Sequence, residues 1–186
     1  MNAVVKIVSS DGLTAATVRR IAQELDCSPG QIHHHFASAD ALRAEAVREV
    51  WRRLEPALIA VLQKFAPRER LVIVLSGCAT AFSNELDPLM HVAERLWKEA
   101  WNIRGDPAVR EAIAEGIGKM YEEIAASLVD GMESGVFPQG LDVGRIAMGL
   151  IAASQGFDML EGIGARDKLG ADKPAFIDSI LRKEGL

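Results

Sequence analysis

Aromatic residues and cysteines are scarce in this sequence of 186 residues. Phe, Trp and Tyr make up 5% of the chain, and the two cysteines, Cys27 and Cys78, lie far apart. Two distant cysteines exclude a disulfide scaffold and predict free thiols in a reducing compartment. The longest apolar run, residues 71–82, is too short to span a bilayer, and the N-terminus lacks the pattern of a secretory signal. We therefore expect a cytoplasmic protein with no membrane segment.

The signatures of catalysis and of metal binding are also missing. The glycines fit no nucleotide-binding pattern, and the sequence contains no G-x-S-x-G, C-x-x-C or H-E-x-x-H motif. The consecutive histidines His33, His34 and His35 would point about 100° apart on a helix, so they cannot converge on one ion. His91, close to Glu94 in the sequence, is typical of a polar pocket or of a surface. We predict no enzymatic activity, no metal site and no cofactor.

Apolar residues recur at helical spacing along most of the chain. No stretch alternates between apolar and polar residues for long enough to form a strand. Proline, glycine and Asp-Pro signals divide the helical pattern into segments. The sequence thus predicts an all-α protein, with two short helices inside residues 17–36 and further helices over residues 2–10, 39–65, 68–85, 87–103, 107–133, 143–161 and 173–183.

Residues 17–36 contain two short helices joined by a tight turn. Thr14 or Thr17 can cap the first helix. Asp26 and Cys27 form the turn, in which an Asp can adopt the left-handed conformation. The first helix has one apolar stripe that we expect to be buried, formed by Val18, Ile21, Ala22 and Leu25.

The second short helix begins with a strong capping signal. Ser28 is expected at the N-cap, a proline follows at the first helical position, and Gln31 completes an S-x-x-Q capping box. Ile32 and Phe36, four residues apart, turn toward the core, and His35 is expected to pack near it or to cap the helix. Two helices with this cap and this turn are typical of a helix-turn-helix, whose second helix lies in the major groove of DNA.

The segment from Thr17 to Leu42, TVRRIAQELDCSPGQIHHHFASADAL, resembles the DNA-binding signature of the TetR family of one-component transcriptional regulators. The likeness is most specific there, and a looser likeness in helix order covers nearly the whole chain. It implies a helix-turn-helix DNA-binding domain over residues 1–46 and an effector-binding and dimerisation domain over residues 47–186. It also implies a homodimer that binds double-stranded operator DNA and a small-molecule effector.

Helical geometry separates the roles of the side chains on the second helix. With Ile32 turned inward, Gly30 and His34 are the most exposed, and Gln31 and His33 lie on the flanks. A Gln side chain can bond adenine through both amide atoms. The resemblance implies backbone contacts for the two histidines and a base contact for the arginine of the first helix. The predicted DNA-binding residues are Thr17, Arg19, Ser28, Pro29, Gly30, Gln31, His33 and His34.

Several features weaken the expected attraction to DNA. Asp26 stands where family members usually have Gly, Ala39 stands where they have a phosphate-binding Lys, and the first helix is shorter than usual. The net charge is −5; residues 1–53 carry seven Lys/Arg and six Asp/Glu, a net of +1, and the remainder carries −6. A second hypothesis therefore stays open, a helical ligand-binding homodimer with weak or lost DNA binding.

Methionines and aromatic residues gather in the C-terminal part, where they are typical of a core or of a pocket for a small molecule. The segment 87–103 places two Trp and one His together. We predict a cavity for a hydrophobic or aromatic effector that releases a repressor from its operator. The predicted lining residues are Cys78, Phe82, Met90, His91, Trp97, Trp101, Met120, Tyr121 and Phe157.

Small residues between Gly144 and Gly156 keep the helix over residues 143–161 thin, which permits close contacts between helices. Together with apolar residues of the last helix, this surface predicts an isologous four-helix dimer interface; internal packing alone is the alternative. Two-fold symmetry suits a palindromic operator with half-sites about one helical turn apart. The apolar residues assigned to the interface are Ile146, Ala147, Leu150, Ile151, Phe176, Ile177, Ile180 and Leu181.

Overall fold

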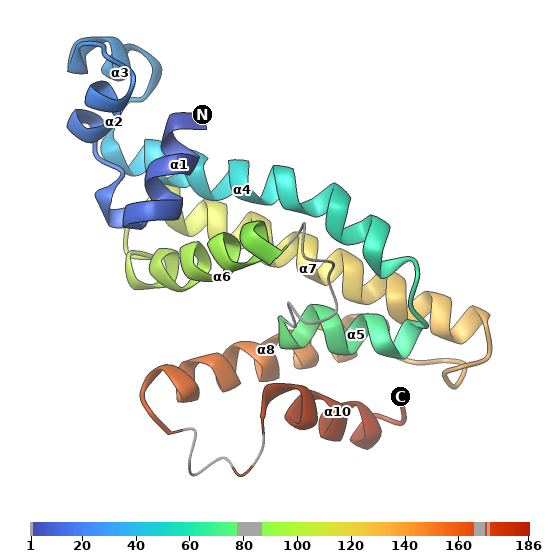
Figure 1. Ribbon diagram of the computed structural model, residues 1–186. Helices are drawn as coiled ribbons and strands as arrows, with labels where there is room; N and C mark the ends of the chain where they lie inside the picture. Colours follow the sequence, from blue (N-terminus) through green and yellow to red (C-terminus); the bar gives the residue numbers. More distant parts are fainter. Residues whose placement is uncertain (1, 78–86, 166–169, 171) are drawn as a thin grey trace. The chain divides into compact units, whose positions relative to one another are not determined.

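The computed structural model describes residues 2–77, 87–165, 170 and 172–186 (Figure 1). All regular elements in this part of the chain are helices, which confirms the predicted all-α fold. The chain divides into two compact units, unit 1 (Met1–Leu58 and Ser83–Ile117) and unit 2 (Ile59–Phe82 and Gly118–Leu186). No helix among the described residues is both long enough and apolar enough to cross a bilayer.

Unit 1 contains the N-terminal helices and the helices that support them. Its elements are α1 (Asn2–Asp11), the 3₁₀ helix η1 (Leu13–Ala15), α2 (Val18–Glu24), α3 (Pro29–His35), most of α4 (Ala39–Leu62), α6 (Asp87–Asn102) and the beginning of α7 (Pro107–Glu133). The Ser38 hydroxyl caps α4, as it accepts a hydrogen bond from Ala41 N at 3.0 Å. The core of unit 1 includes the fully buried side chains of Ile7, Leu13, Ile21, Leu42, Leu54 and Leu96.

Unit 2 contains the end of α4, α5 (Pro67–Ser76), the rest of α7, α8 (Val143–Gly162) and α10 (Lys173–Lys183). Asp142 and Asp172 cap α8 and α10, accepting from Arg145 N at 3.0 Å and from Ala175 N at 2.8 Å. The buried Ser154 hydroxyl donates to Leu75 O at 2.6 Å and so joins α8 to α5.

The structure corrects two predicted helix ends. α5 ends at Ser76, earlier than predicted, because Gly77 adopts a left-handed conformation with φ 64°; residues 78–85, also predicted helical, lie outside the described residues. α4 runs through Pro56, as predicted, but ends at Leu62 and not at Phe65.

The apolar residues assigned to a dimer interface belong largely to the core of unit 2. Ile146, Leu150 and Ile151 are 2%, 1% and 4% exposed, and Ala147, Ile177 and Leu181 are also buried. Assigning these buried residues to an interface was wrong, since they pack inside the unit. The exposed apolar side chains of α8 and its C-cap lie on another face, which comprises Met148, Met159, Leu160 and Ile163.

Candidate nucleic-acid interface

α2 begins with the cap that the sequence predicts. The Thr17 hydroxyl accepts a hydrogen bond from Arg20 N at 3.2 Å, and Ile21 and Ala22 are buried. Leu25, however, is 52% exposed, so its assignment to the buried stripe was wrong. α2 ends at Glu24, which places Leu25 beyond the last helical residue and outside the period of the stripe.

The turn between α2 and α3 depends on a left-handed aspartate. Asp26 has φ 49° and is the one residue other than glycine with positive φ among the described residues, as the sequence predicts. Cys27 N donates to Ala22 O at 2.9 Å, which closes the turn directly after α2. The turn thereby directs the chain into α3.

A complete capping box begins α3. Gln31 N donates to the Ser28 hydroxyl at 3.4 Å, and Ser28 N donates to Gln31 Oε1 at 2.9 Å. The amide oxygen of Gln31 is therefore engaged in the cap, although the residue is exposed. Gln31 can bond adenine through both amide atoms only when this hydrogen bond opens.

α3 is anchored by one side chain and exposes most of the others. Ile32 is 5% exposed, while Pro29, Gly30 and Gln31 and the three histidines are all exposed. The expectation that His35 packs near the core was wrong, and Phe36 is only half-buried. The helix has seven residues and Phe36 is already extended with φ −131°, so the predicted four-residue spacing from Ile32 does not continue along one helix.

A cleft of about 330 Å³ lies between α2 and the beginning of α3. It brings together two predicted DNA-binding residues, Arg19 and Pro29, with residues of α2 and the turn. Gln23, which sequence reasoning missed, lies one turn after Arg19 on the same exposed face of α2. The cleft is lined by Arg19, Ala22, Gln23, Asp26, Cys27 and Pro29.

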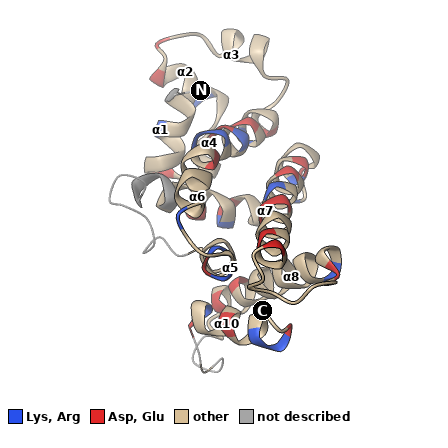
Figure 2. Ribbon diagram, turned by 90° about the vertical axis from the view of Figure 1, so that its right-hand side faces the viewer, with Lys and Arg blue, Asp and Glu red and all other residues tan. Residues whose placement is uncertain are grey.

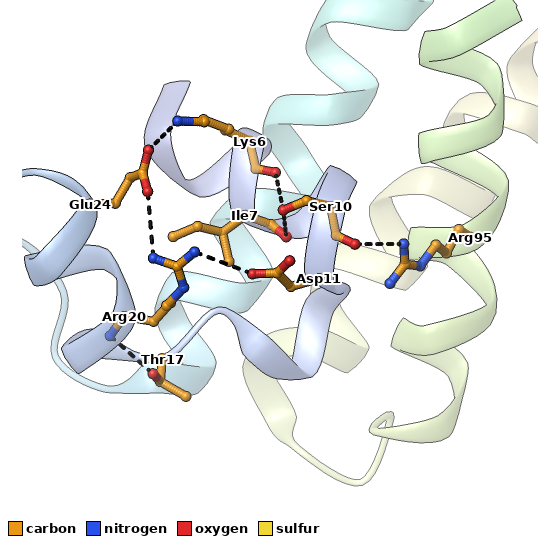
Figure 3. A network of polar contacts seen from close by, with 8 residues as sticks. All are labelled: Lys6, Ile7, Ser10, Asp11, Thr17, Arg20, Glu24 and Arg95. Carbon is orange, nitrogen blue, oxygen red and sulfur yellow. Dashed lines mark hydrogen bonds and ion pairs between the residues drawn. The ribbon is translucent and has the colours of Figure 1, made fainter.

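Ion pairs join α1 to α2 (Figure 3). Lys6 pairs with Glu24, and Arg20 reaches Asp11 at 3.4 Å and Glu24 at 3.5 Å. The hydrogen bond from Lys6, together with the charges of Lys6 and Arg20, lowers the pKa of Glu24. Two cations near the predicted interface are thus bound to neighbouring carboxylates.

α6 holds the end of α1 through two charged side chains. Arg95 Nη1 donates to Ser9 O at 3.3 Å and to Ser10 O at 3.4 Å, the carbonyl groups at the end of α1 (the contact with Ser10 is drawn in Figure 3). Glu99 accepts from Leu13 N at the beginning of η1. A cation therefore faces helix carbonyls and an anion faces a backbone N–H, the polarity that each helix end favours.

Gly12 lies at this junction, between the end of α1 and η1. Its φ of 93° disfavours other residues, and a Cβ would lie 2.8 Å from Arg95 Nη2 and from both carboxylate oxygens of Glu99. We call Gly12, Arg95 and Glu99 the α1–α6 junction. Sequence reasoning missed it, since Leu13 and Glu99 lie 86 residues apart.

α6 also carries two residues of a tryptophan cluster, which we define as Trp51, Trp97 and Trp101. The rings of Trp51 and Trp97 meet edge to face with centroids 5.7 Å apart, and those of Trp97 and Trp101 are 6.4 Å apart. Gly116 of α7 faces the cluster; a Cβ there would approach Trp97 to 2.9 Å. The indole N–H of Trp101 is buried and has no hydrogen-bond partner among the described residues. The cluster includes Trp51 of α4, which sequence reasoning missed.

The other predicted effector-site residues belong to several elements of the two units. His91 is exposed on α6, and Met120 and Tyr121 are half-buried on the part of α7 in unit 2. Phe157 is 2% exposed, and its ring centroid lies 5.1 Å from that of Phe176 in unit 2. Cys78 and Phe82 lie outside the described residues, and Met90 falls within α6.

Similarity to known proteins agrees with this geometry. Residues 1–46 match the family of bacterial regulatory proteins named after tetR. The HTH-type transcriptional regulator BetI of Brucella anthropi is 31% identical over 188 residues, which cover 99% of this chain and 87% of that protein.

Two solved structures share the fold. A protein from Saccharomonospora viridis, described as a transcriptional regulator and solved in complex with choline, superposes with a TM-score of 0.70 at 23% identity, covering 97% of this chain and 92% of that one. The transcriptional regulator FadR of Bacillus subtilis, in complex with stearoyl-CoA, gives a TM-score of 0.60 at 18% identity, covering 99% and 95%. The chain therefore belongs to the TetR family of bacterial transcriptional regulators, which are DNA-binding proteins and not enzymes.

Proposed function

We propose that this regulator is a cytoplasmic repressor that binds a palindromic operator as a homodimer and leaves it when a small effector binds. The observation that carries the proposal is α3, which is fixed by a capping box and by Ile32 and exposes the rest of its surface. A helix anchored on one side in this way can enter the major groove of DNA.

Base reading is assigned to Arg19 and Gln31, because an arginine and an amide can each make paired hydrogen bonds to a base edge. The remaining predicted residues position the helix: Thr17, Ser28 and Pro29 at the helix ends, Gly30 by allowing close approach, and His33 and His34 toward phosphate. Gln23 joins this set, since it lines the cleft beside Arg19.

The proposed dimer uses the exposed face of α8 together with α10. Met148, Met159 and Ile163 are 55%, 66% and 74% exposed. Gly149 and Gly156 lie on the same helix, and a Cβ added at either position would meet nothing within 4 Å. A second helix can therefore approach this surface closely. A two-fold dimer would present two copies of α3 to half-sites about one helical turn apart.

The proposed effector site is the tryptophan cluster. Indole faces bind apolar surfaces and also cations such as quaternary ammonium groups. Two neighbours of the same fold were solved with small molecules, choline in one and stearoyl-CoA in the other. An effector weakens DNA binding when it binds better to the dimer conformation in which the two copies of α3 do not match the spacing of the half-sites. DNA then weakens effector binding by the same factor.

Selection of genomic fragments with the purified protein at moderate salt tests the DNA-binding role. The expected result is enrichment of an inverted repeat, and Gln31→Ala should relax the preference at one position by about 1–3 kcal/mol. Lys64→Gln, two residues after the end of α4, is the matched control. If no sequence is enriched over random DNA, the proposed function is wrong.

Tryptophan fluorescence tests the effector site directly, because all three tryptophans of the chain lie in the cluster. Choline and stearoyl-CoA are titrated separately against the protein and against its complex with the selected operator. One of them should change the emission and release the DNA at the same concentrations. Trp51→Phe should weaken that response while leaving operator binding intact. Release of DNA with no change in emission would place the effector elsewhere.

A second candidate is a ligand-binding homodimer that has lost useful DNA affinity. It is favoured by the occupied amide oxygen of Gln31 and by the ion pairs that engage Lys6 and Arg20. This candidate predicts ligand-induced fluorescence changes without any enriched DNA sequence.

A further inference from the structure

Positive charge is scarce in the N-terminal 46 residues. They hold four Lys/Arg against five Asp/Glu, a net of −1. Most of these cations are engaged in ion pairs, namely Lys6–Glu24, Arg20–Asp11, Arg20–Glu24 and Arg43–Asp40. Within residues 2–46, Arg19 is the remaining cation, and it forms no ion pair with a described residue. Lys and Arg therefore supply little of the charge needed to hold DNA phosphates.

α3 itself carries no Lys, Arg, Asp or Glu, and Figure 2 shows it in tan. Its ionisable side chains are His33, His34 and His35, which we call the histidine triplet; all three are exposed. No ion pair joins the triplet to a charged group elsewhere in the described part of the chain. The charged residues nearest to α3 along the chain are Arg19, Arg20 and Glu24 of α2, Asp26 of the turn, and Asp40 and Arg43 at the beginning of α4.

Histidine is the side chain that gains a positive charge between about pH 8 and pH 5 in ordinary surroundings. A protonated imidazole has two N–H donors and can bond phosphate oxygens with both. The rings of His34 and His35 lie 5.5 Å apart, so one anion can lie beside both. The negative charge of a phosphate beside the rings favours their protonated form in the complex.

We propose that operator binding by this regulator takes up protons on the histidine triplet, so that its affinity for DNA rises as the pH falls from about 8 to about 6. The inference rests on the proposed function, because it requires α3 to face DNA. Protonated imidazoles replace the Lys and Arg contacts that the N-terminal segment lacks.

The size of the effect follows from linkage. Each proton taken up on association raises the affinity by up to tenfold for each unit by which the pH falls. With one proton per protomer or more, we expect the dimer to bind the operator at least tenfold more tightly at pH 6.0 than at pH 7.5. The salt dependence should also become steeper, by roughly 0.9 in the logarithmic slope for each added contact.

Fluorescence anisotropy with the operator duplex from the genomic selection, measured at pH 6.0 to 8.0 and at several salt concentrations, tests the proposal. A triple variant, His33→Gln, His34→Gln and His35→Gln, should bind with little pH dependence. Because this variant removes contacts as well as charge, the double variant His33→Lys, His34→Lys is the second arm. The charge of its two lysines does not change between pH 6.0 and 8.0. This variant should therefore bind the operator tightly at pH 8.0, and its affinity should depend less on pH. Lys64→Gln, outside α3, should keep the pH dependence of operator affinity that the natural protein shows.

The outcomes separate the two proposals. Specific binding whose affinity is the same from pH 6.0 to 8.0 overturns this inference alone. So does a pH dependence that survives unchanged in both the glutamine and the lysine variants. Absence of sequence-specific binding at every pH overturns the proposed function, and this inference with it.

Discussion

At the scale of single residues, two glycines of α7 differ in their surroundings. A Cβ on Gly131 would lie 2.0 Å from the ring of Phe137, which is 3% exposed, whereas a Cβ on Gly118 meets nothing within 4 Å. Gly131→Ala should lower the free energy of unfolding by about 1–3 kcal/mol through overpacking. Gly118→Ala should raise it by about 0.5–1 kcal/mol because alanine favours the helix.

Urea unfolding of both variants measures the two changes in the free energy of unfolding. The comparison between them does not depend on the absolute stability of the protein. Equal effects of the two substitutions would mean that Phe137 does not pack against α7 in solution.

Ser28 has a structural role that can be separated from DNA reading. Ser28→Ala removes the cap of α3 and should cost about 1 kcal/mol of stability, whereas Ser28→Asp keeps a side-chain acceptor and should cost less. Thermal unfolding followed by circular dichroism measures both. If the two variants lose equal stability, the capping hydrogen bond contributes little.

Residues close in sequence were predicted well, and contacts between distant residues were not. The capping box of Ser28 and the left-handed Asp26 follow from neighbours within three residues, so the pattern contains the needed information. Leu25 was misplaced because a helical period does not mark where the helix ends. Trp51, Arg95 and Glu99 were missed because their partners depend on how helices pack, which no local pattern specifies.

At the scale of elements, an ion pair joins α5 to α10. Arg68 pairs with Asp178 at 2.6 Å and also donates to Leu186 O at 3.2 Å. The hydrogen bond and charge of Arg68, with a further contribution from Arg182, lower the pKa of the Asp178 carboxyl. A lowered pKa in the folded state stabilises the protein above the carboxyl's ordinary range, and this contribution is lost as the pH falls through the lowered value.

Asp178→Asn should therefore destabilise the protein near neutral pH, and the difference from the natural protein should shrink below about pH 4. Urea unfolding at pH 7, 5, 4 and 3 measures it, and Arg68→Met should give the same pH profile. A difference that stays constant over this range would show that the pair does not titrate with folding.

At the scale of the whole molecule, self-association depends on a few exposed side chains of α8. Met159→Glu should convert the proposed dimer to a monomer, since the dimer would bury that charge without a partner. Met159→Leu is the matched control and should leave the dimer intact. Analytical ultracentrifugation distinguishes the two states, and the monomeric variant should bind one half-site with greatly reduced affinity. A dimer that survives Met159→Glu would place the interface on another surface.

The α1–α6 junction limits how freely this DNA-binding segment could be exchanged with that of a relative. A chimera that joins residues 1–46 to another body leaves the carbonyl groups of Ser9 and Ser10 and the N–H of Leu13 without Arg95 and Glu99. The α6 helix of the other protein would need a cation and an acid, four residues apart, at the positions of Arg95 and Glu99. The residue before η1 would have to stay Gly12. A graft must therefore transfer Gly12, Arg95 and Glu99 together, although they come from two distant stretches of the sequence. The set of residues that this segment needs in order to pack correctly is thus larger than its continuous sequence.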